Sequence, residues 1–325
     1  MNWKRKNDKA MKKLFLFALF ATLCCSCSKD DQIDLYMIHV PKKGTLAAVL
    51  EEKGLNAGTI VSLKITGELN EEDFIPIQSM TNLVKIDLSE VNLPMLFERA
   101  FCGNNMIKKV TLPKNLETIG DYAFAECTSL TSIEITSTVE TIGDYAFDYC
   151  TSLKTVTFEK GSHLKTIGDQ AFSECTFLTS IEIPESVTTI GDEAFYFCDL
   201  TSIKIPKSVE TIGEGAFGDC ALKTVTFEQN SRIQTIGRFA FMRSDIVTVD
   251  MSQYKRNDIT IGERAFSECP KLQLFKIGAN IPPHCSDAFG NINLYSVLKV
   301  PSGSIDAYKA ATGWNSFASI TGLDE

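Results

Sequence analysis

Cysteine is the residue type in this sequence whose spacing most invites a chemical interpretation. Thiols can form disulfides or bind metal. A thiol that recurs once per repeat instead behaves as a small buried hydrophobic group, and no Cys-x-x-Cys pair follows Cys27. We therefore expect reduced structural thiols, and the redox state of Cys102 and Cys285, which lie outside the series, stays open. Six cysteines each follow a phenylalanine by three residues, namely Cys127, Cys150, Cys175, Cys198, Cys220 and Cys269, whereas Ser244 and Ile292 take this place in two further copies.

Aspartate also recurs at one place in the same pattern. The carboxylates could suggest calcium, but one per repeat is too sparse for a calcium site. We expect each aspartate to cap a one-turn helix, and the preceding glycine to adopt a positive φ in a tight turn. The series consists of Asp121, Asp144, Asp169 and Asp192, and it is broken by Glu214, Arg238 and Glu263.

Catalytic residues are not evident in the pattern. The three histidines, His39, His163 and His284, lie far apart in the sequence, so they suggest neither a zinc site nor a nucleophilic triad. Neighbouring carboxylates such as Glu134 and Glu182 occur, but nothing makes one pair special. The sequence therefore predicts no catalytic residue, no metal, no cofactor and no enzyme.

A repeated motif must position these side chains. Thr-Ile-Gly-x-x-Ala-Phe occurs seven times, starting at Thr118, Thr141, Thr166, Thr189, Thr211, Thr235 and Thr260, and degenerate copies end at Phe101 and Phe289. The motif phenylalanines are 22 to 25 residues apart. Between the motifs an apolar pattern such as Leu130-x-x-Ile133-x-Ile135 alternates at its end, which indicates a short strand with one buried face. Such a period is typical of a solenoid.

The whole pattern resembles the BspA-like leucine-rich-repeat family over roughly residues 80–300. The resemblance implies an α/β solenoid, a leucine-rich repeat with a period of about 23 residues, short strands stacked in parallel and terminal caps. We expect a signal peptide at 1–26 with Met11 as the start, and a lipidated N-terminus and linker at 27–43. The N-terminal cap is expected at 44–80, the solenoid at 81–300 and the C-terminal cap at 301–325.

The N-terminal residues have the pattern of an export signal. Lys12 and Lys13 precede a short apolar run at 14–23, too short to span a bilayer. Ser26–Cys27 resembles the lipobox of bacterial lipoproteins, which implies acylation at Cys27. The residues at 28–31 resemble a surface-export tag, which favours the outer membrane surface, lipid-anchored, over a periplasm-facing position. The alternative is a secretory signal cleaved without lipidation.

Net charge excludes one class of partner. The chain carries −9, and without residues 1–26 it retains 26 basic and 40 acidic residues, or −14. Such an acidic surface repels phosphate backbones, so we expect no nucleic-acid partner. Membrane contact is expected only through the lipid anchor.

The outward positions of the expected strands are the candidate binding residues. They form a Ser/Thr-rich, mixed-charge face of the kind on which repeat proteins bind partners. The leading hypothesis is a cell-surface lipoprotein that binds an extracellular or host protein, in the manner of an adhesin. The alternatives are glycan capture for nutrient uptake, with polysaccharide as the partner, and a passive envelope spacer. The candidates are Ser132, Glu134, Thr155, Thr157, Ser180, Glu182, Ser202, Lys204, Thr224, Thr226, Thr248 and Asp250, continued by Lys276.

Overall fold

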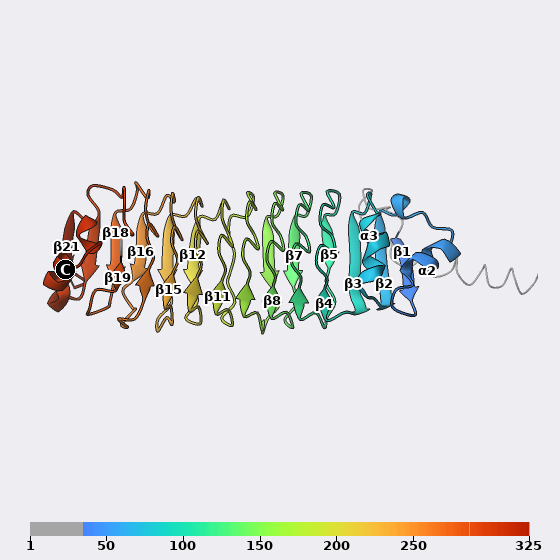
Figure 1. Ribbon diagram of the computed structural model, residues 1–325, viewed down its shortest axis with the longest axis horizontal. Coiled ribbons are helices and arrows are strands. Elements are labelled where there is room, and N and C mark those ends of the chain that lie inside the picture. The colour runs from blue at the N-terminus through green and yellow to red at the C-terminus, as the bar shows by residue number, and fades with distance from the viewer. Residues whose placement is uncertain (1–34, 286, 325) are drawn as a thin grey trace, which may run out of the picture. The chain divides into compact units, whose positions relative to one another are not determined.

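The computed structural model describes residues 35–285 and 287–324, which wind into an elongated solenoid (Figure 1). Most coils contribute one longer strand to one wall, here the long-strand wall, and one two-residue strand to the other, the short-strand wall. Strands of successive coils pair in parallel and in register, for example Thr166 with Thr189 and Ser202 with Thr224. The stacked, parallel solenoid that the repeats predict is confirmed.

The long-strand wall comprises two six-stranded sheets. The first contains β1 (Leu35–Val40), β2 (Ser62–Glu68), β3 (Lys85–Asn92), β5 (Lys109–Thr111), β7 (Ser132–Ile135) and β9 (Thr155–Phe158). The second contains β12 (Ser202–Ile205), β14 (Thr224–Phe227), β16 (Thr248–Met251), β18 (Leu274–Ile277), β20 (Val297–Val300) and β21 (Ser319–Gly322).

The short-strand wall is one continuous nine-stranded sheet. Its strands are β4 (Met95–Leu96), β6 (Thr118–Ile119), β8 (Thr141–Ile142), β10 (Thr166–Ile167), β11 (Thr189–Ile190), β13 (Thr211–Ile212), β15 (Thr235–Ile236), β17 (Thr260–Ile261) and β19 (His284–Cys285). The α-helices belong to the ends of the rod and are α2 (Leu46–Glu52), α3 (Phe74–Gln78) and α4 (Ile305–Ala310). Single 3₁₀ turns lie at Ala57–Thr59, Glu71–Asp73, Ser302–Ser304 and Trp314–Ser316.

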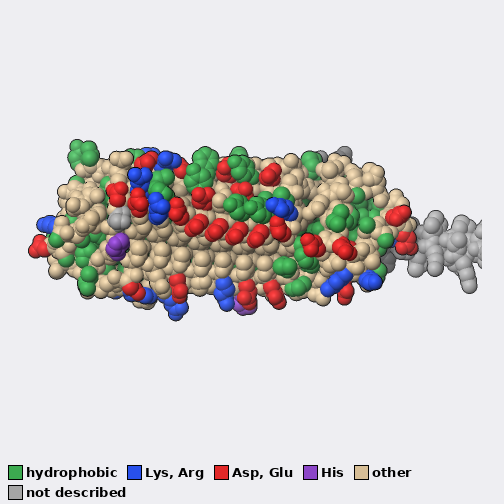
Figure 2. Space-filling view, viewed as in Figure 1, with side chains coloured by type: hydrophobic (Ala, Val, Ile, Leu, Met, Phe, Trp, Pro, Cys, Tyr) green, Lys and Arg blue, Asp and Glu red, His purple; other side chains and the backbone are tan. Residues whose placement is uncertain are grey.

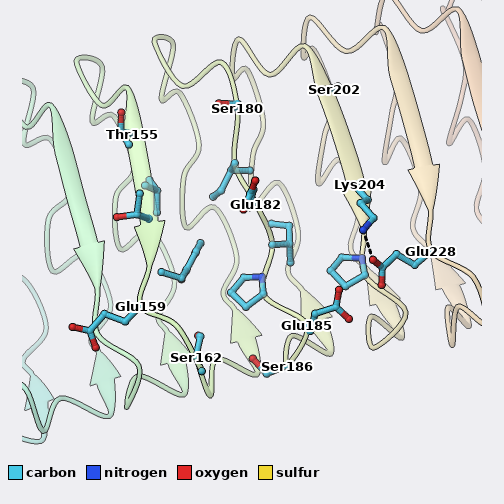
Figure 3. Close-up of a pocket in the computed structure, with 18 of the residues that line it drawn as sticks. Thr155, Glu159, Ser162, Ser180, Glu182, Glu185, Ser186, Ser202, Lys204 and Glu228 are labelled. Carbon is cyan, nitrogen blue, oxygen red and sulfur yellow. Dashed lines mark ion pairs between the residues drawn. The ribbon is translucent and has the colours of Figure 1, made fainter.

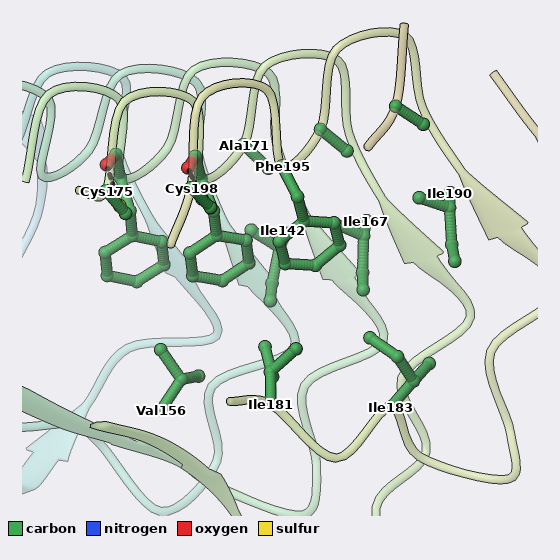
Figure 4. Close-up of a cluster of buried hydrophobic side chains, with 14 of the residues drawn as sticks. Ile142, Val156, Ile167, Ala171, Cys175, Ile181, Ile183, Ile190, Phe195 and Cys198 are labelled. Carbon is green, nitrogen blue, oxygen red and sulfur yellow. Dashed lines mark hydrogen bonds between the residues drawn. The ribbon is translucent and has the colours of Figure 1, made fainter. Parts of the chain in front are cut away.

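The motif phenylalanines form one stacked column through the core. From Phe101 to Phe266, the ring centroids of consecutive coils lie 5.0–5.3 Å apart and the planes differ by at most 8°. This separation is close to the spacing of parallel strands, about 4.8 Å, so the rings stack at the coil repeat. The isoleucines of the short strands lie beside the column. Buried residues of the long-strand wall, such as Val156 and Ile181, lie on its other side (Figure 4).

The segment between the motif aspartate and the cysteine is a turn, and the one-turn helix expected there does not form. The N–H groups of Tyr122 and Phe124 donate to the carbonyls of Asp144 and Ala146 in the next coil at 2.9 and 2.7 Å. The N–H of Ala125 instead donates back to Tyr122 at 3.1 Å. Tyr122 has φ of 55°, so this variable position of the motif is left-handed. Alternate N–H groups therefore bond between coils and within the turn.

The expectation that the motif glycine takes a positive φ is wrong. Tyr122 and its equivalents carry the positive φ, and the glycines of the seven full heptads do not. A Cβ at Gly143 would lie 2.4 Å from Oδ1 of Asp121 and 2.9 Å from its backbone nitrogen. Glycine is required because the backbones of consecutive coils approach too closely for any side chain.

Both ends of the phenylalanine column are covered. At the N-terminal end, Phe74 of α3 packs edge-on against Phe101 at 5.8 Å. At the other end, Phe317 meets Phe289 at 4.8 Å, and the indole N–H of Trp314 donates to the carbonyl of Pro283 at 3.0 Å. These contacts fill the ends with aromatic rings where the next coil would otherwise stack.

The expected linker at 27–43 needs a correction. Residues Leu35–Val40 form β1, which pairs in parallel with β2 from Leu35 to Val40. The pattern of the strand explains this, because Ile38 and Val40 are buried. The stack therefore begins before the expected cap. Residues 1–34, with the signal peptide and Cys27, lie outside the described residues.

Candidate binding surface

The six cysteines of the repeat form a column of buried thiols next to the phenylalanines. Each thiol donates to the carbonyl of the motif phenylalanine in the preceding coil, as Cys198 does to Phe172 at 3.1 Å and Cys150 to Phe124 at 3.1 Å. Ser244 makes the equivalent, longer contact with Phe217 at 3.5 Å. All eight described cysteines are free. The column is thus a series of inter-coil hydrogen bonds.

Burial makes these thiols unreactive. It raises the pKa of Cys150 and Cys198 well above the usual value, and that of Cys127 to about 12. A nucleophilic cysteine needs the opposite shift. Cys285 is buried as well, whereas Cys102 is partly exposed; burial also raises the pKa of the Cys102 thiol.

The aspartate series caps the neighbouring coil. Oδ1 of Asp121 accepts the backbone N–H of Asp144 at 2.9 Å. In the same way Asp144 accepts from Asp169, Asp169 from Asp192 and Asp192 from Glu214, at 2.7–2.8 Å. Each carboxylate therefore satisfies a backbone donor of the next turn. Acidic side chains form a row along the face in Figure 2. Among the described residues, no group of three or more His, Cys, Asp or Glu side chains could hold a metal ion.

The histidines and the carboxylate pair are not brought into one site. Nδ1 of His39 lies 3.0 Å from the Thr66 hydroxyl, near the N-terminal end, and His284 lies in β19 near the other end. Glu134 belongs to β7, whereas Glu182 follows β9 and lies outside the sheet. No helix within the described residues is long and apolar enough to cross a membrane.

The twelve candidate binding residues all lie on the outer surface of the long-strand wall. Their alternation with buried residues is regular, as in β7, where Ser132 and Glu134 are exposed and Ile133 and Ile135 are buried. Ser132 through Thr157 lie on the first sheet, and Ser202 through Asp250 on the second. Ser180 and Glu182 belong to the coil between them, which forms no long strand.

The long-strand wall is interrupted at this coil, residues 178–183. No backbone hydrogen bond joins it to β9, and a single bond, from Thr201 N–H to the Thr179 carbonyl at 3.2 Å, joins it to the next coil. In three other repeat coils the residue after the strand donates to the preceding coil, as Glu159 does to Ile135 at 2.9 Å. Pro184 and Pro206 occupy this place in two successive coils and have no N–H to donate. The two prolines therefore remove one ladder donor on each side of this coil.

A groove of about 970 Å³ occupies the interruption. It extends from β9 across residues 180–186 to β12, as Figure 3 shows. Six of the twelve candidates line it, namely Thr155, Thr157, Ser180, Glu182, Ser202 and Lys204.

The charged residues of the groove are mainly acidic. Four glutamates line it, Glu159, Glu182, Glu185 and Glu228, against Lys154 and Lys204. Lys204 forms an ion pair with Glu228 (Figure 3). The hydroxyl of Ser186 is buried and has no hydrogen-bond partner among the described residues. Glu159, Glu185, Ser186 and Glu228 were not among the candidate residues, and the successive prolines are the signal that could have indicated this part of the surface.

Aromatic residues near the motif divide into two groups. The rings of Tyr122 and Tyr145 stack at 4.6 Å, so these two contribute to packing between coils. Tyr149, Phe177 and Phe197 are 44%, 56% and 51% exposed in three successive coils. Apolar side chains also gather on the face in Figure 2, above the acidic row. The second group could contact a ligand.

Comparison with known proteins identifies the family of the repeats. The model of the BspA type leucine-rich repeat region matches residues 94–220 and 188–310, with six copies. No protein with a curated description matches the chain. Among solved structures, a leucine-rich repeat protein from Bacteroides ovatus has a TM-score of 0.57 at 23% identity, over 82% of this chain and 62% of its own. The chain thus spans about 62% of the length of that protein.

A second solved structure, a leucine-rich repeat protein of T. pallidum, matches at 25% identity with a TM-score of 0.42, over 58% of this chain and 78% of its own. A leucine-rich cell surface protein from Faecalibacterium prausnitzii matches at 21% identity with a TM-score of 0.41, over 88% of this chain and 83% of its own. The Bacteroides ovatus structure supports the same fold.

Proposed function

The chain belongs to the BspA-type leucine-rich-repeat family, and from this membership we propose that it is a cell-surface protein that binds an extracellular macromolecule. The partner is an extracellular or host protein, and the contact surface is the long-strand wall. A lipid at Cys27 anchors the chain to the outer membrane, facing outward. No reaction is part of this function, which is adhesion-like binding.

One observation carries the proposal. The outer positions of β7, β9 and β12 on the long-strand wall are exposed and polar, and the same wall contains the groove. The short-strand wall, in contrast, is one regular sheet in which seven of the nine strands are Thr-Ile. Variation in side chains and an interrupted backbone are therefore concentrated on one wall, and sequence variation on a fixed scaffold is how repeat proteins obtain specificity.

The experiment is binding of the purified chain, residues 28–325, to a panel of extracellular matrix proteins and bacterial surface proteins. The variant Thr155→Lys/Thr157→Lys changes the long-strand wall. The matched control, Thr235→Lys/Thr260→Lys, adds the same charges at exposed positions of the short-strand wall. Saturable binding that the first variant loses and the second retains supports the proposal. Equal loss in both variants, or no binding to any protein, contradicts it.

A second candidate function is glycan capture, and the exposed rings of Tyr149, Phe177 and Phe197 favour it. Aromatic faces pack well against apolar surfaces such as those of sugar rings. A polysaccharide panel tests this candidate with the double variant Phe177→Ala/Phe197→Ala. Binding that this variant loses but Thr155→Lys/Thr157→Lys retains would favour glycan capture over protein binding. Absence of binding to both panels would favour a passive spacer.

A further inference from the structure

The interrupted coil leaves main-chain groups without partners. The N–H groups of Ile181 and Ile183 donate to no carbonyl in the described chain, and the carbonyls of Phe158 and Ile183 accept from no N–H of the following coil. Both isoleucines are at least 92% buried as residues, with 8% and 7% of their surface exposed. Backbone groups so placed are ordinarily paired. The groove at this point therefore offers both backbone donors and backbone acceptors.

Two sheet edges also face each other across this coil. β9 pairs with β7 on one side alone, and β12 pairs with β14 on one side alone. Such free edges bind an additional strand readily, and most edges of the rod are instead occupied by the next coil. The opening is specific to this place, because the short-strand wall continues without interruption through β10, β11 and β13.

The charges select the type of strand. Four glutamates against two lysines line the groove, and Lys204 is already paired with Glu228. Glu182, at the centre, is exposed and forms no ion pair or hydrogen bond within the described residues. Its negative charge acts on Lys204, and its carboxylate can also meet a cation of a ligand.

We propose that the groove between β9 and β12 binds an extended, basic segment of a partner protein by β-strand addition. The partner's backbone bonds to the free N–H groups of Ile181 and Ile183, and a lysine or arginine side chain of the partner meets Glu182. Main-chain bonds give affinity in this mode of recognition, and side chains give specificity. The inference rests on the proposed function, because it assigns the partner's chemistry to the same wall.

The first test uses the purified chain, residues 28–325, and a fluorescent peptide of alternating threonine and lysine, long enough to cover the four residues of β9. The matched control peptide carries N-methyl groups on alternate amides, which remove backbone donors and keep the charges. Saturable binding by the first peptide and at least about tenfold weaker binding by the second is expected. No binding, or equal binding by both, overturns the proposal, since equal binding shows attraction of charges alone.

The second test changes the protein. Pro184→Thr/Pro206→Thr supplies the two missing N–H donors and is expected to close the groove and reduce peptide binding at least about tenfold. Pro113→Thr is the control, because Pro113 follows β5 in an uninterrupted part of the wall. Glu182→Gln should weaken binding several-fold, whereas Glu134→Gln, at the equivalent position of β7, should not. Unchanged binding in the double proline variant overturns the proposal.

The two proposals can fail separately. If a panel protein loses binding in Thr155→Lys/Thr157→Lys but binds the double proline variant normally, the wall binds proteins and the groove is not the site. If the peptide binds as expected and no panel protein does, strand addition is supported and the proposed partner class is contradicted. Thermal unfolding of each variant checks that it is folded.

Discussion

Gly191 offers a sharp test of how consecutive coils are held together. A Cβ at this position would lie 2.5 Å from Oδ1 of Asp169 and 2.6 Å from the carbonyl carbon of Gly168. Both atoms belong to the preceding coil, and one is backbone, so Gly191→Ala must push the two coils apart. The movement strains two hydrogen bonds, from Gly191 N–H to Ile167 at 2.8 Å and from Asp192 N–H to Asp169 at 2.8 Å.

The magnitude follows from these contacts. Overpacking costs about 1–3 kcal/mol, and each weakened hydrogen bond about 0.5–1.5 kcal/mol. We expect Gly191→Ala to lower the free energy of unfolding by about 4 kcal/mol. Gly161→Ala should cost about 1–2 kcal/mol, because Gly161 has φ of 81° and nothing within 4 Å. Gly303→Ala, with open space and no positive φ, should stay within about 0.5 kcal/mol of the wild type.

Denaturant unfolding measures the order of the three variants, and hydrogen exchange of the 167–192 amides shows whether the loss is local, since a solenoid need not unfold in one step. Gly191→Asn separates close approach from a need for positive φ, because asparagine tolerates the left-handed region. Gly191→Asn should lower the free energy of unfolding at least as much as Gly191→Ala does. A Gly191→Asn variant clearly more stable than Gly191→Ala, or a Gly191→Ala variant as stable as Gly303→Ala, would refute the reasoning.

Three further outcomes are expected. In the folded chain of residues 28–325 a thiol reagent should label Cys102 before the seven buried cysteines, which should stay unmodified until denaturant is added; labelling of two or more in the folded state would contradict the column of buried thiols. Burial, with the Glu174 charge, raises the pKa of Asp148 to about 6, so the ionised side chain destabilises the fold at pH 7, and this cost is progressively lost as pH falls from 7 to 5. The rise in Tm on acidification should therefore be smaller in Asp148→Asn than in the surface control Asp199→Asn, and an equal rise in both would exclude the effect. Asp169→Ala should cost about 1 kcal/mol of unfolding free energy, since it removes an acceptor from the next coil, whereas Asp169→Asn keeps that oxygen and should cost less; equal losses in denaturant unfolding would contradict this role.

The sequence predicts the parts of the fold that depend on periodicity. The motif heptads fix which residues face the core, because one residue type per coil can only be buried in a column. The phenylalanine stack and the buried position of Cys198 follow from this, and so does the exposure of Thr155 and Thr157 on one face. These features repeat from coil to coil, so the recurrence of the heptad predicts them for every coil.

Local backbone geometry could be predicted less well from the sequence. Tyr122 and Glu126 have φ of 55° and 59°, and non-glycine residues in that region give no sequence signal, whereas the neighbouring glycine suggested the opposite assignment. The neighbouring coil determines the left-handed conformation, because its carbonyls accept the N–H groups of these residues. Likewise β1 was missed because Leu35–Val40 precedes the repeats and pairs only through tertiary context.

The interruption of the long-strand wall illustrates how a repeat protein can open one wall without losing its fold. At Gly191 the coils are held on the short-strand wall by backbone bonds, by the aspartate oxygens and by the stacked phenylalanines, none of which involves the long strands. Removing donors at Pro184 and Pro206 therefore costs bonds on one wall alone. The heptad holds consecutive coils together, so the strand residues are free to differ. Within the solenoid coils that the structure describes, the interrupted coil leaves backbone groups unpaired, and we infer that another backbone can bind there.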